Sequence, residues 1–318
     1  SSTPSTTSDS AATASSDGRD AGSDTTSAPP TTARMPEVTT PVLTWTECGE
    51  NLDCATLTAP LDWANPDDRT VQMPVVRFKA RKPSQRIGSM LVNPGGPGFG
   101  GTVLARSATS LFSKTLLDRF DIVGWDPRGT GGSNPAVDCI SDYDHFFASG
   151  DGTDSAAEHQ RDIDLSKELA QACASKNGDL LAHISTQDAA RDMDLLRRAL
   201  GEDRISYFGF SYGSELGATW ATMFPTTVRA AVLDGAADPN ADALQSVVDQ
   251  AHGFETALNS FFEYCRKKCK YPRGGDPAVR FDEILANISA HTYPTVANRP
   301  PLSWSMTWLA VGEALYSQ

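Results

Sequence analysis

The residues with the clearest chemical potential form the motif Gly-Phe-Ser-Tyr-Gly at positions 209–213. It matches the Gly-x-Ser-x-Gly nucleophile elbow, in which a serine hydroxyl attacks an acyl carbon. Chance alone supplies the pattern in roughly one chain in five of this length, so the flanking sequence must decide its meaning. A buried strand is expected at 204–210 and a helix of small residues at 213–224, which is the context the elbow needs. We therefore predict that Ser211 is a nucleophile and not a serine of an ordinary tight turn.

Backbone N–H groups near this serine could stabilise the negative charge that its attack creates. Ser211 would lie at the start of a helix, where the N–H of Tyr212 is free to bind an oxyanion. The loop at 93–98 reads Asn-Pro-Gly-Gly-Pro-Gly and follows an apolar run, so Gly95 or Gly96 is predicted to supply a second donor. A phosphate-binding loop is the alternative interpretation, but the lysine of such loops is missing and the prolines remove donors.

The acid and the base of a catalytic triad are not evident in the sequence. In this architecture the chain order is Ser, then Asp or Glu, then His. The histidines after the serine are His252 and His291, and both fall in helical patterns, so each is interpreted as a solvated or core histidine. Asp234 and Asp238 follow a strand and occupy plausible acid positions, although the acid usually follows one strand later. We therefore expect the acid and the histidine to lie beyond Gln318.

Other charged residues near these loops have structural interpretations. The sequence Asp-Pro-Arg-Gly at 126–129 follows a strand expected at 120–125. We predict that Asp126 and Arg128 hold neighbouring loops together through charge-assisted hydrogen bonds. Glu215 could contact a substrate amine, but a helix-face carboxylate is the favoured interpretation.

The elements that must position these residues alternate between strands and helices. Strands are expected at 71–79, 87–92, 120–125, 204–210 and 228–233, and helices at 156–175, 186–200 and 213–224. The alternation predicts an α/β fold with a doubly wound, mostly parallel sheet. The strand at 71–79 is expected at a sheet edge, where Pro74 is tolerated.

Composition divides the chain into three parts. Residues 1–41 are predicted to be a disordered Ser/Thr-rich tail, since 17 of the first 33 residues are Ser or Thr. Residues 42–239 form the predicted hydrolase core. Residues 240–318 carry helical patterns at 243–266, 278–291 and 304–316 and are predicted to be an incomplete helical cap. The tail fits a spacer between an exported domain and the cell envelope, with a dispensable N-terminus as the alternative.

Charge and hydropathy exclude several classes of partner. The chain has 318 residues, and 40 acidic against 27 basic residues give a net charge of −13, which argues against nucleic-acid binding. No run of 18 or more apolar residues is present, so no transmembrane span is expected. No metal or organic cofactor is implied by the motifs. Since the chain starts at Ser1 without a hydrophobic leader, we expect that a signal peptide has been removed.

Six cysteines, an even number, favour disulfides and export. They permit 15 pairings. Closeness in the sequence suggests Cys48–Cys54 and Cys265–Cys269 and, by remainder, Cys139–Cys173. Zinc binding is the alternative, but the cysteines lack Cys-x-x-Cys spacing and the five histidines are scattered.

The stretch 186–239, TQDAARDMDLLRRALGEDRISYFGFSYGSELGATWATMFPTTVRAAVLDGAADP, resembles the secreted tripeptidyl aminopeptidases of actinobacteria, within the proline-iminopeptidase-like α/β-hydrolase serine peptidases. Similar segments are CATLTAPLDWANPDD at 54–68, the loop at 93–98 and the sequence from Asp126 to Ser133. The closing Ala-Leu-Tyr-Ser at 314–317 resembles the lid helix of these enzymes. The resemblance covers about residues 45–318.

The resemblance implies a nucleophile at Ser211, oxyanion donors at Tyr212 and at Gly95 or Gly96, and a cap that restricts access to peptide N-termini. Family members place the acid and the histidine in a C-terminal segment. The implied substrate is a peptide with a free N-terminus, from which tripeptides are released outside the cell. Asn93, where relatives often carry His, departs from the pattern, and so does Glu215.

Two alternatives remain open. A secreted carboxylesterase would use the same elbow and oxyanion donors. A truncated, non-catalytic relative is the other, because the expected acid and histidine are missing. We therefore expect the 318-residue chain by itself to be inactive and incompletely folded.

Overall fold

The computed structural model describes residues 36–148, 150, 155–236, 242–270, 274–296 and 299–316. Residues 1–35, the larger part of the predicted tail, lie outside this set. Residues 36–41 were also assigned to the tail, yet Val38 packs against the core and its carbonyl accepts a hydrogen bond from Arg198 at 3.0 Å. One apolar side chain and one backbone contact are enough to attach this segment, and composition does not reveal them. The boundary between core and cap stays a prediction.

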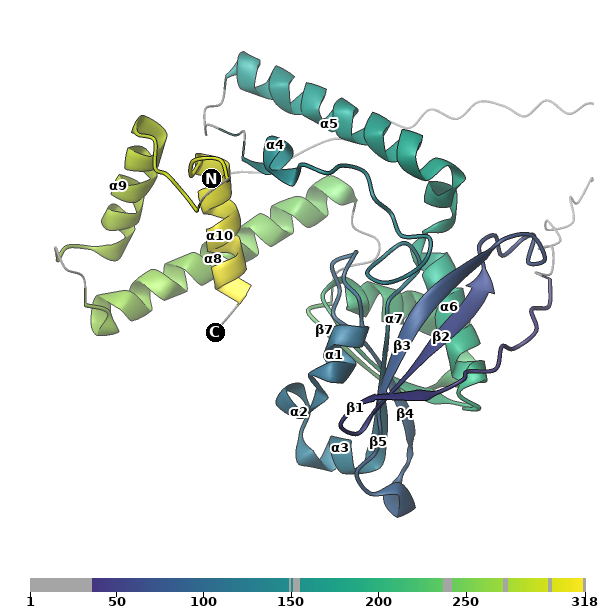
Figure 1. Cartoon of the computed structure of the whole chain (residues 1–318). Helices are drawn as coiled ribbons and strands as arrows, with labels where there is room; N and C mark the ends of the chain where they lie inside the picture. The colour runs from purple at the N-terminus through teal and green to yellow at the C-terminus, as the bar shows by residue number, and fades with distance from the viewer. Residues whose placement is uncertain are drawn as a thin grey trace, which may run out of the picture. The chain divides into compact units, whose positions relative to one another are not determined.

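A seven-stranded mixed sheet organises the described residues (Figure 1). The strands are β1 (Thr46–Gly49), β2 (Leu52–Pro60), β3 (Thr70–Phe78), β4 (Gly88–Asn93), β5 (Phe120–Trp125), β6 (Ile205–Phe210) and β7 (Val228–Asp234). Their spatial order is β1-β2-β3-β5-β4-β6-β7. Strands β5, β4, β6 and β7 pair in parallel, and β1, β2 and β3 extend the sheet in antiparallel pairs. The predicted α/β-hydrolase fold class is confirmed.

Strand β3 does not lie at a sheet edge, so the prediction for residues 71–79 was wrong on this point. It pairs with β2 along its whole length and with β5 from Val75 onwards. Pro74 is paired with Thr56 of β2 and precedes the first β5 pair, Val75 with Trp125. The missing N–H of Pro74 therefore falls outside the β3–β5 ladder, which explains how an interior strand accommodates a proline.

The helices connect these strands and follow the predicted periodicity closely. They are α1 (Thr102–Arg106), α2 (Ala108–Leu111), α3 (Lys114–Arg119), α4 (Tyr143–Phe147), α5 (Ala156–Asn177), α6 (Thr186–Ala199), α7 (Tyr212–Met223), α8 (Ala243–Lys268), α9 (Pro277–Ala290) and α10 (Trp304–Tyr316), with 3₁₀ turns at Pro83–Gln85, Gly178–His183 and Pro225–Thr227. Helix α6 shows why: the Ser185 hydroxyl accepts the Asp188 N–H at 3.1 Å at its start, and Gly201 follows its end with φ +71°.

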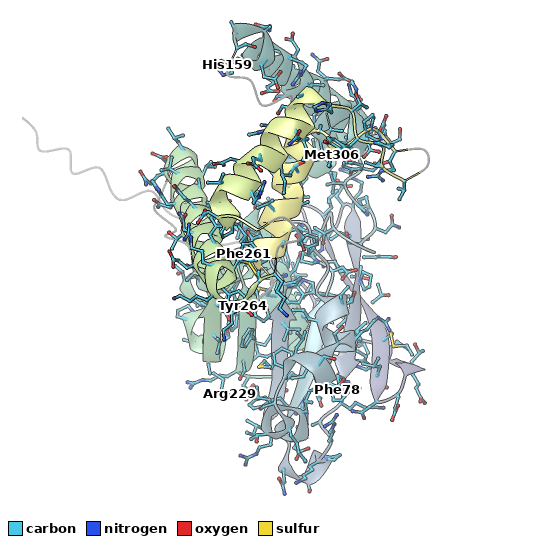
Figure 2. All side chains as sticks on the ribbon, turned by 90° about the vertical axis from the view of Figure 1, so that its left-hand side faces the viewer. Phe78, His159, Arg229, Phe261, Tyr264 and Met306 are labelled. Atoms are coloured by element: carbon cyan, nitrogen blue, oxygen red, sulfur yellow. A yellow bond between two sulfur atoms is a disulfide. The ribbon has the colours of Figure 1, made fainter. Side chains whose placement is uncertain are left out.

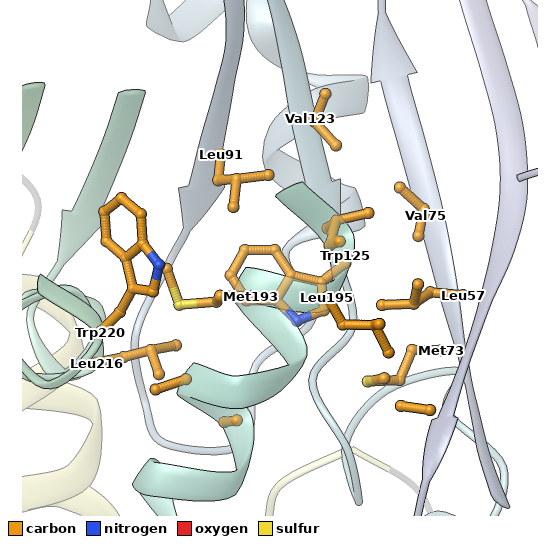
Figure 3. Packing of buried hydrophobic residues seen from close by; sticks show 14 of the residues in the cluster. Leu57, Met73, Val75, Leu91, Val123, Trp125, Met193, Leu195, Leu216 and Trp220 are labelled. Atoms are coloured by element: carbon orange, nitrogen blue, oxygen red, sulfur yellow. The ribbon is translucent and has the colours of Figure 1, made fainter. Parts of the chain in front are cut away.

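Alternating side chains of the central strands pack into two separate hydrophobic cores. Leu91 of β4 and Trp125 of β5 lie in one cluster with Met193 of α6 and Trp220 of α7 (Figure 3). On the other face, Met90 and Val92 of β4 pack with Leu117 of α3 and with Phe112, which lies between α2 and α3. Because successive residues of a strand point to opposite faces, the sheet is covered on both sides and its strand ends are held firmly.

The segment after residue 242 is helical, as predicted, and contains exposed aromatic residues. Helix α8 begins at the capping side chain of Asp242, which accepts the Gln245 N–H at 2.8 Å, and ends with a basic turn. Phe261 and Tyr264 of α8 are 48% and 61% exposed (Figure 2). In the described part of the chain, no helix has both the length and the apolar character that a membrane crossing requires.

All six cysteines are paired as predicted, in the disulfides Cys48–Cys54, Cys139–Cys173 and Cys265–Cys269. The first joins β1 to β2, the second joins the segment after β5 to α5, and the third closes the end of α8. Two of the bonds link residues that are only a few positions apart, which is why closeness in the sequence was a sufficient guide.

Candidate active site

Ser211 stands between the end of β6 and the start of α7, and its backbone is in an unfavourable conformation. Its φ of +52° and ψ of −125° lie in a region that residues with a side chain rarely adopt. The Ser211 N–H donates to the Asp234 carbonyl at 2.8 Å, and the Ser214 N–H donates to the Ser211 carbonyl at 2.7 Å. These two bonds keep the turn in place, and Ser211 itself is exposed. The geometry is that of a nucleophile elbow.

The two glycines of the motif are required by lack of space. A β-carbon on Gly213 would lie 2.8 Å from the Asn93 carbonyl oxygen, and one on Gly209 would collide with the Gly213 carbonyl. Both contacts are closer than a real β-carbon tolerates. The motif Gly-x-Ser-x-Gly is therefore explained by close packing of β4, β6 and α7 around the serine.

The loop at 93–98 meets the elbow directly, as the sequence suggested. A β-carbon on Gly95 would lie 2.5 Å from the Phe210 carbonyl oxygen, 3.0 Å from the Ser211 β-carbon and 3.1 Å from the Tyr212 backbone nitrogen. Gly95 is buried with φ +96°, whereas Gly96 is exposed with φ +112°. The structure thus brings Ser211, Tyr212 and Gly95 together at the carboxyl ends of β4 and β6, and Gly96 is the next residue of the loop.

The side chain of Tyr212 has a separate role from its backbone N–H, because it contacts the start of α6. Its hydroxyl lies 3.0 Å from the Thr186 hydroxyl. Burial raises the pKa of the Tyr212 hydroxyl, the hydrogen bond with Thr186 opposes that rise, and the neighbouring Glu215 carboxylate adds to it. Glu215 is half-buried in the first turn of α7. Its side chain therefore lies close to Tyr212, one helical turn after the nucleophile.

Asp126 and Arg128 bind neighbouring loops, which confirms their predicted structural roles. Asp126 accepts the Thr102 N–H at 3.1 Å and hydroxyl at 2.8 Å with one oxygen, and the Gly132 N–H at 2.9 Å with the other. Arg128 donates two hydrogen bonds of 2.7 Å to the carboxylate of Asp192. The Arg128–Asp192 pair is fully buried, and its two parallel hydrogen bonds compensate both charges.

The remaining acid and base candidates do not complete a triad here. The carboxyl-terminal end of β7 places Asp234 beside Ser211 through its backbone, while Asp238 lies outside the described residues. His252 lies within α8 and His291 follows α9, and both are exposed. Within the described ranges, no hydrogen bond joins either imidazole to Ser211. In the same ranges, no group of three His, Cys, Asp or Glu side chains is arranged to hold a metal ion.

Asn93 is the residue at this site whose role the sequence did not reveal. It ends β4, is 1% exposed and accepts the Gly95 N–H through its side-chain oxygen at 2.9 Å. The sequence offered one signal: a polar side chain directly after an apolar strand and directly before the glycine-rich loop.

Comparison with known proteins places the chain among hydrolases. The sequence profile of the family described as alpha/beta hydrolase fold matches residues 88–278. The chain is 40% identical over 228 residues to the serine protease Hip1 of Mycobacterium tuberculosis, which is 71% of this chain and 44% of that protein. It is 34% identical over 226 residues to the tripeptidyl aminopeptidase of Streptomyces coelicolor, 66% of this chain and 41% of that protein.

A third relative carries a different name. The chain is 38% identical over 254 residues to carboxylesterase B of Mycobacterium tuberculosis, 76% of this chain and 48% of that protein. The chain therefore spans less than half the length of each of these three relatives.

Proposed function

This chain belongs to the α/β-hydrolase fold family, and on that basis we propose that it is part of an exported serine exopeptidase that releases short peptides, tripeptides in particular, from substrate N-termini. The observation that carries the proposal is the strained Ser211 backbone held against the glycine-rich loop at 93–98. Strain of this kind persists only where surrounding contacts enforce it, and it exposes the hydroxyl at the edge of the sheet. Relatives named as a serine protease and a tripeptidyl aminopeptidase support the choice of a peptide substrate.

In the proposed reaction, the Ser211 hydroxyl attacks the carbonyl carbon of the scissile peptide bond. The N–H of Tyr212 and an N–H of Gly95 or Gly96 bind the oxyanion that forms. The amine leaves with a proton, an acyl-enzyme remains on Ser211, and water hydrolyses it. Because the described histidines do not contact Ser211, the general base and its acid partner are proposed to come from outside residues 1–318.

The proposed substrate is a peptide with a free amino terminus. The chain carries a net charge of −13, which favours a cationic ligand over an anionic one. Glu215, one turn after the nucleophile, is a carboxylate that could attract an ammonium group. Three disulfides support the proposal that the protein works outside the cytoplasm, since disulfides persist in oxidising compartments. Envelope anchoring through the N-terminal tail belongs to the same proposal.

A carboxylesterase is the second candidate, because a relative with that name is 38% identical. Ester and amide hydrolysis share the tetrahedral intermediate, so the described site serves both reactions. Kinetics on tripeptidyl anilides and on acyl esters would separate the two candidates. Efficient ester cleavage without any release of tripeptides would contradict the peptidase proposal.

The role of Ser211 can be tested with a fluorophosphonate probe on the full-length protein. We expect labelling at Ser211 and its loss in Ser211→Ala, with peptide hydrolysis reduced by about 10⁴-fold or more. Thr222→Ala is a matched control near the other end of α7, because its exposed hydroxyl donates only to the Ala218 carbonyl of the same helix. Labelling of another residue in Ser211→Ala at the original rate would show that Ser211 is not the nucleophile. Residues 1–318 alone should react far more slowly than the full-length protein, and equal rates would refute the proposed external base.

A further inference from the structure

Asn93 connects the glycine-rich loop to the nucleophile elbow. It is the last residue of β4 and pairs with Gly209 of β6. A β-carbon on Gly213 would lie 2.9 Å from its side-chain oxygen, so the amide packs against the first turn of α7. The same oxygen accepts the Gly95 N–H at 2.9 Å. One buried side chain therefore touches both the glycine-rich loop and the helix that follows the nucleophile.

This hydrogen bond changes which N–H group is available to a substrate. Gly95 is buried and its N–H is already engaged by Asn93. Pro94 and Pro97 have no N–H to offer. Gly96 is exposed, and its N–H has no hydrogen-bond acceptor among the described residues. Of the two glycines that the sequence could not separate, Gly96 alone keeps a free donor.

The position of the loop is compatible with that assignment. The Gly95 backbone lies against Ser211 and Tyr212, as the 3.0 Å and 3.1 Å separations of a hypothetical Gly95 β-carbon show. The Gly96 N–H belongs to the peptide unit that immediately follows, and consecutive α-carbons are about 3.8 Å apart. The free donor therefore belongs to the residue directly after the glycine that contacts the nucleophile.

We propose that Asn93 is the positioning residue of the oxyanion hole, and that Gly96 supplies the second donor beside Tyr212. The Asn93 side chain occupies the Gly95 N–H and fixes the loop against α7, so that the Gly96 N–H is held towards the reacting carbonyl. The inference rests on the proposed function insofar as it requires Ser211 to perform acyl transfer. It does not depend on whether the acyl group belongs to a peptide or to an ester.

The kinetic test uses the full-length protein with Asn93→Leu, which keeps the side-chain size and removes the acceptor. We expect kcat to fall by about 10²-fold and KM to stay within about 3-fold, because the oxyanion donor acts in the transition state. The affinity of a peptide boronic acid, which mimics the tetrahedral intermediate, should fall by a similar factor, while that of the product peptide should not change. A kcat within 3-fold of the wild type in folded Asn93→Leu would overturn the proposal.

Ser89→Ala is the matched control, because Ser89 is a fully buried polar residue on the same strand as Asn93. Its hydroxyl accepts a hydrogen bond from Arg86 at 3.0 Å and lies at the other end of β4. We expect this variant to lose stability but to keep kcat and boronic acid affinity within about 2-fold. A loss of kcat in Ser89→Ala equal to that in Asn93→Leu would reduce the role of Asn93 to general stability.

Hydrogen exchange provides a readout that does not require activity. In the wild-type protein we expect the Gly95 amide to exchange at least about 100-fold more slowly than the Gly96 amide, since only the former is bonded and buried. Equal protection of both amides would contradict the assignment even if Asn93→Leu failed to fold. If Ser211 were unreactive towards every acyl substrate, the proposed function would fail, and exchange would still decide the Asn93–Gly95 contact.

Discussion

At the scale of single residues, backbone strain is concentrated at the proposed nucleophile. Two non-glycine residues in the described ranges have positive φ, Asn51 at +58° and Ser211 at +52°. Asparagine adopts this conformation comparatively easily, but serine has no such tendency. A glycine at position 211 would avoid this conformational strain, but it would not provide a hydroxyl group. The strain therefore indicates that the hydroxyl is required.

Gly213→Ala tests the close packing around this serine. Its β-carbon would meet the carbonyl and side-chain oxygens of Asn93 at 2.8 Å and 2.9 Å, so we expect a loss of about 1–3 kcal/mol in the free energy of unfolding. We also expect the folded variant to lose activity, because the loop and the elbow would move apart. Chemical denaturation and fluorophosphonate labelling measure the two effects.

Gly253→Ala is the control for that substitution. Gly253 lies inside α8 with open space around its hypothetical β-carbon, so alanine should stabilise the helix by up to about 1 kcal/mol. If the two alanine variants had equal stability and activity, the packing argument for Gly213 would be wrong.

At the scale of elements, a charged network joins the amino-terminal ends of the four parallel strands. Glu202 accepts hydrogen bonds from Arg86 at 2.8 Å and from Arg229 of β7 at 3.1 Å. Arg86 also donates to Asp121 of β5 at 2.9 Å. The strand-start network of these four residues lies at the opposite end of the strands from Ser211. It helps to fix the register of the parallel strands, and Asn93, Ser211 and Asp234 lie at their carboxyl ends.

This network makes stability depend on pH. Burial raises the pKa of Glu202, but hydrogen bonds from Arg86, Arg229 and Ser89 outweigh it, and the net pKa is lowered. A group whose folded pKa is lower than its unfolded value, about 4.3 for Glu, stabilises the protein fully above that pH. The stabilisation is lost as the pH falls through the lower, folded value.

Glu202→Gln should reduce the free energy of unfolding at pH 7 by about 2 kcal/mol, because two arginines lose a charged acceptor. The difference from the wild type should begin to shrink below the unfolded pKa of about 4.3 and disappear as the pH falls through the lower, folded pKa, where Glu202 becomes protonated in the wild type as well. Urea denaturation between pH 3 and pH 7 measures both. Glu263→Gln on the surface of α8 removes an exposed partner of Arg266 and should change stability by less than about 0.5 kcal/mol. A constant Glu202→Gln difference across this pH range would contradict the linkage.

At the scale of the whole molecule, Arg128 joins parts of the chain that are distant in sequence. Besides Asp192 of α6, it donates to the carbonyls of Pro60 and Leu61 at the end of β2, at 2.9 Å and 2.8 Å. It also donates to the carbonyl of His183 at 2.9 Å. Burial raises the pKa of Asp192 to about 6, and the charge and hydrogen bonds of Arg128 oppose this rise.

Arg128→Met would leave the buried Asp192 carboxylate without its partner. We expect a loss of about 3–5 kcal/mol in the free energy of unfolding. Adding Asp192→Leu should restore part of that loss, because the unpaired charge is then removed, although the backbone carbonyls stay unsatisfied. Thermal denaturation of both variants tests this order. A double variant less stable than Arg128→Met alone would show that the carboxylate is not the source of the cost.

Much of the architecture could be predicted because it is local. The strands at 120–125 and 228–233 and the helices at 186–200 and 213–224 follow from apolar periodicity and turn residues. Two of the disulfides followed from short separations, and the third followed by remainder. Predictions failed where a distant contact decided: Pro74 sits in an interior strand because the β3–β5 ladder begins after it, and Val38 is held by α6.

The sequence by itself determined the elbow, the glycine-rich loop and the fold class, since each depends on residues that are adjacent along the chain. Only the tertiary structure decided that Asn93 engages the Gly95 N–H and leaves that of Gly96 free. Both glycines satisfy the same steric requirement, so their types do not distinguish them. The hydrogen bond itself is local, because Asn93 and Gly95 are two positions apart. The burial of Asn93 and its contact with Gly213 depend on the pairing of β4 with β6, which joins residues more than 100 positions apart.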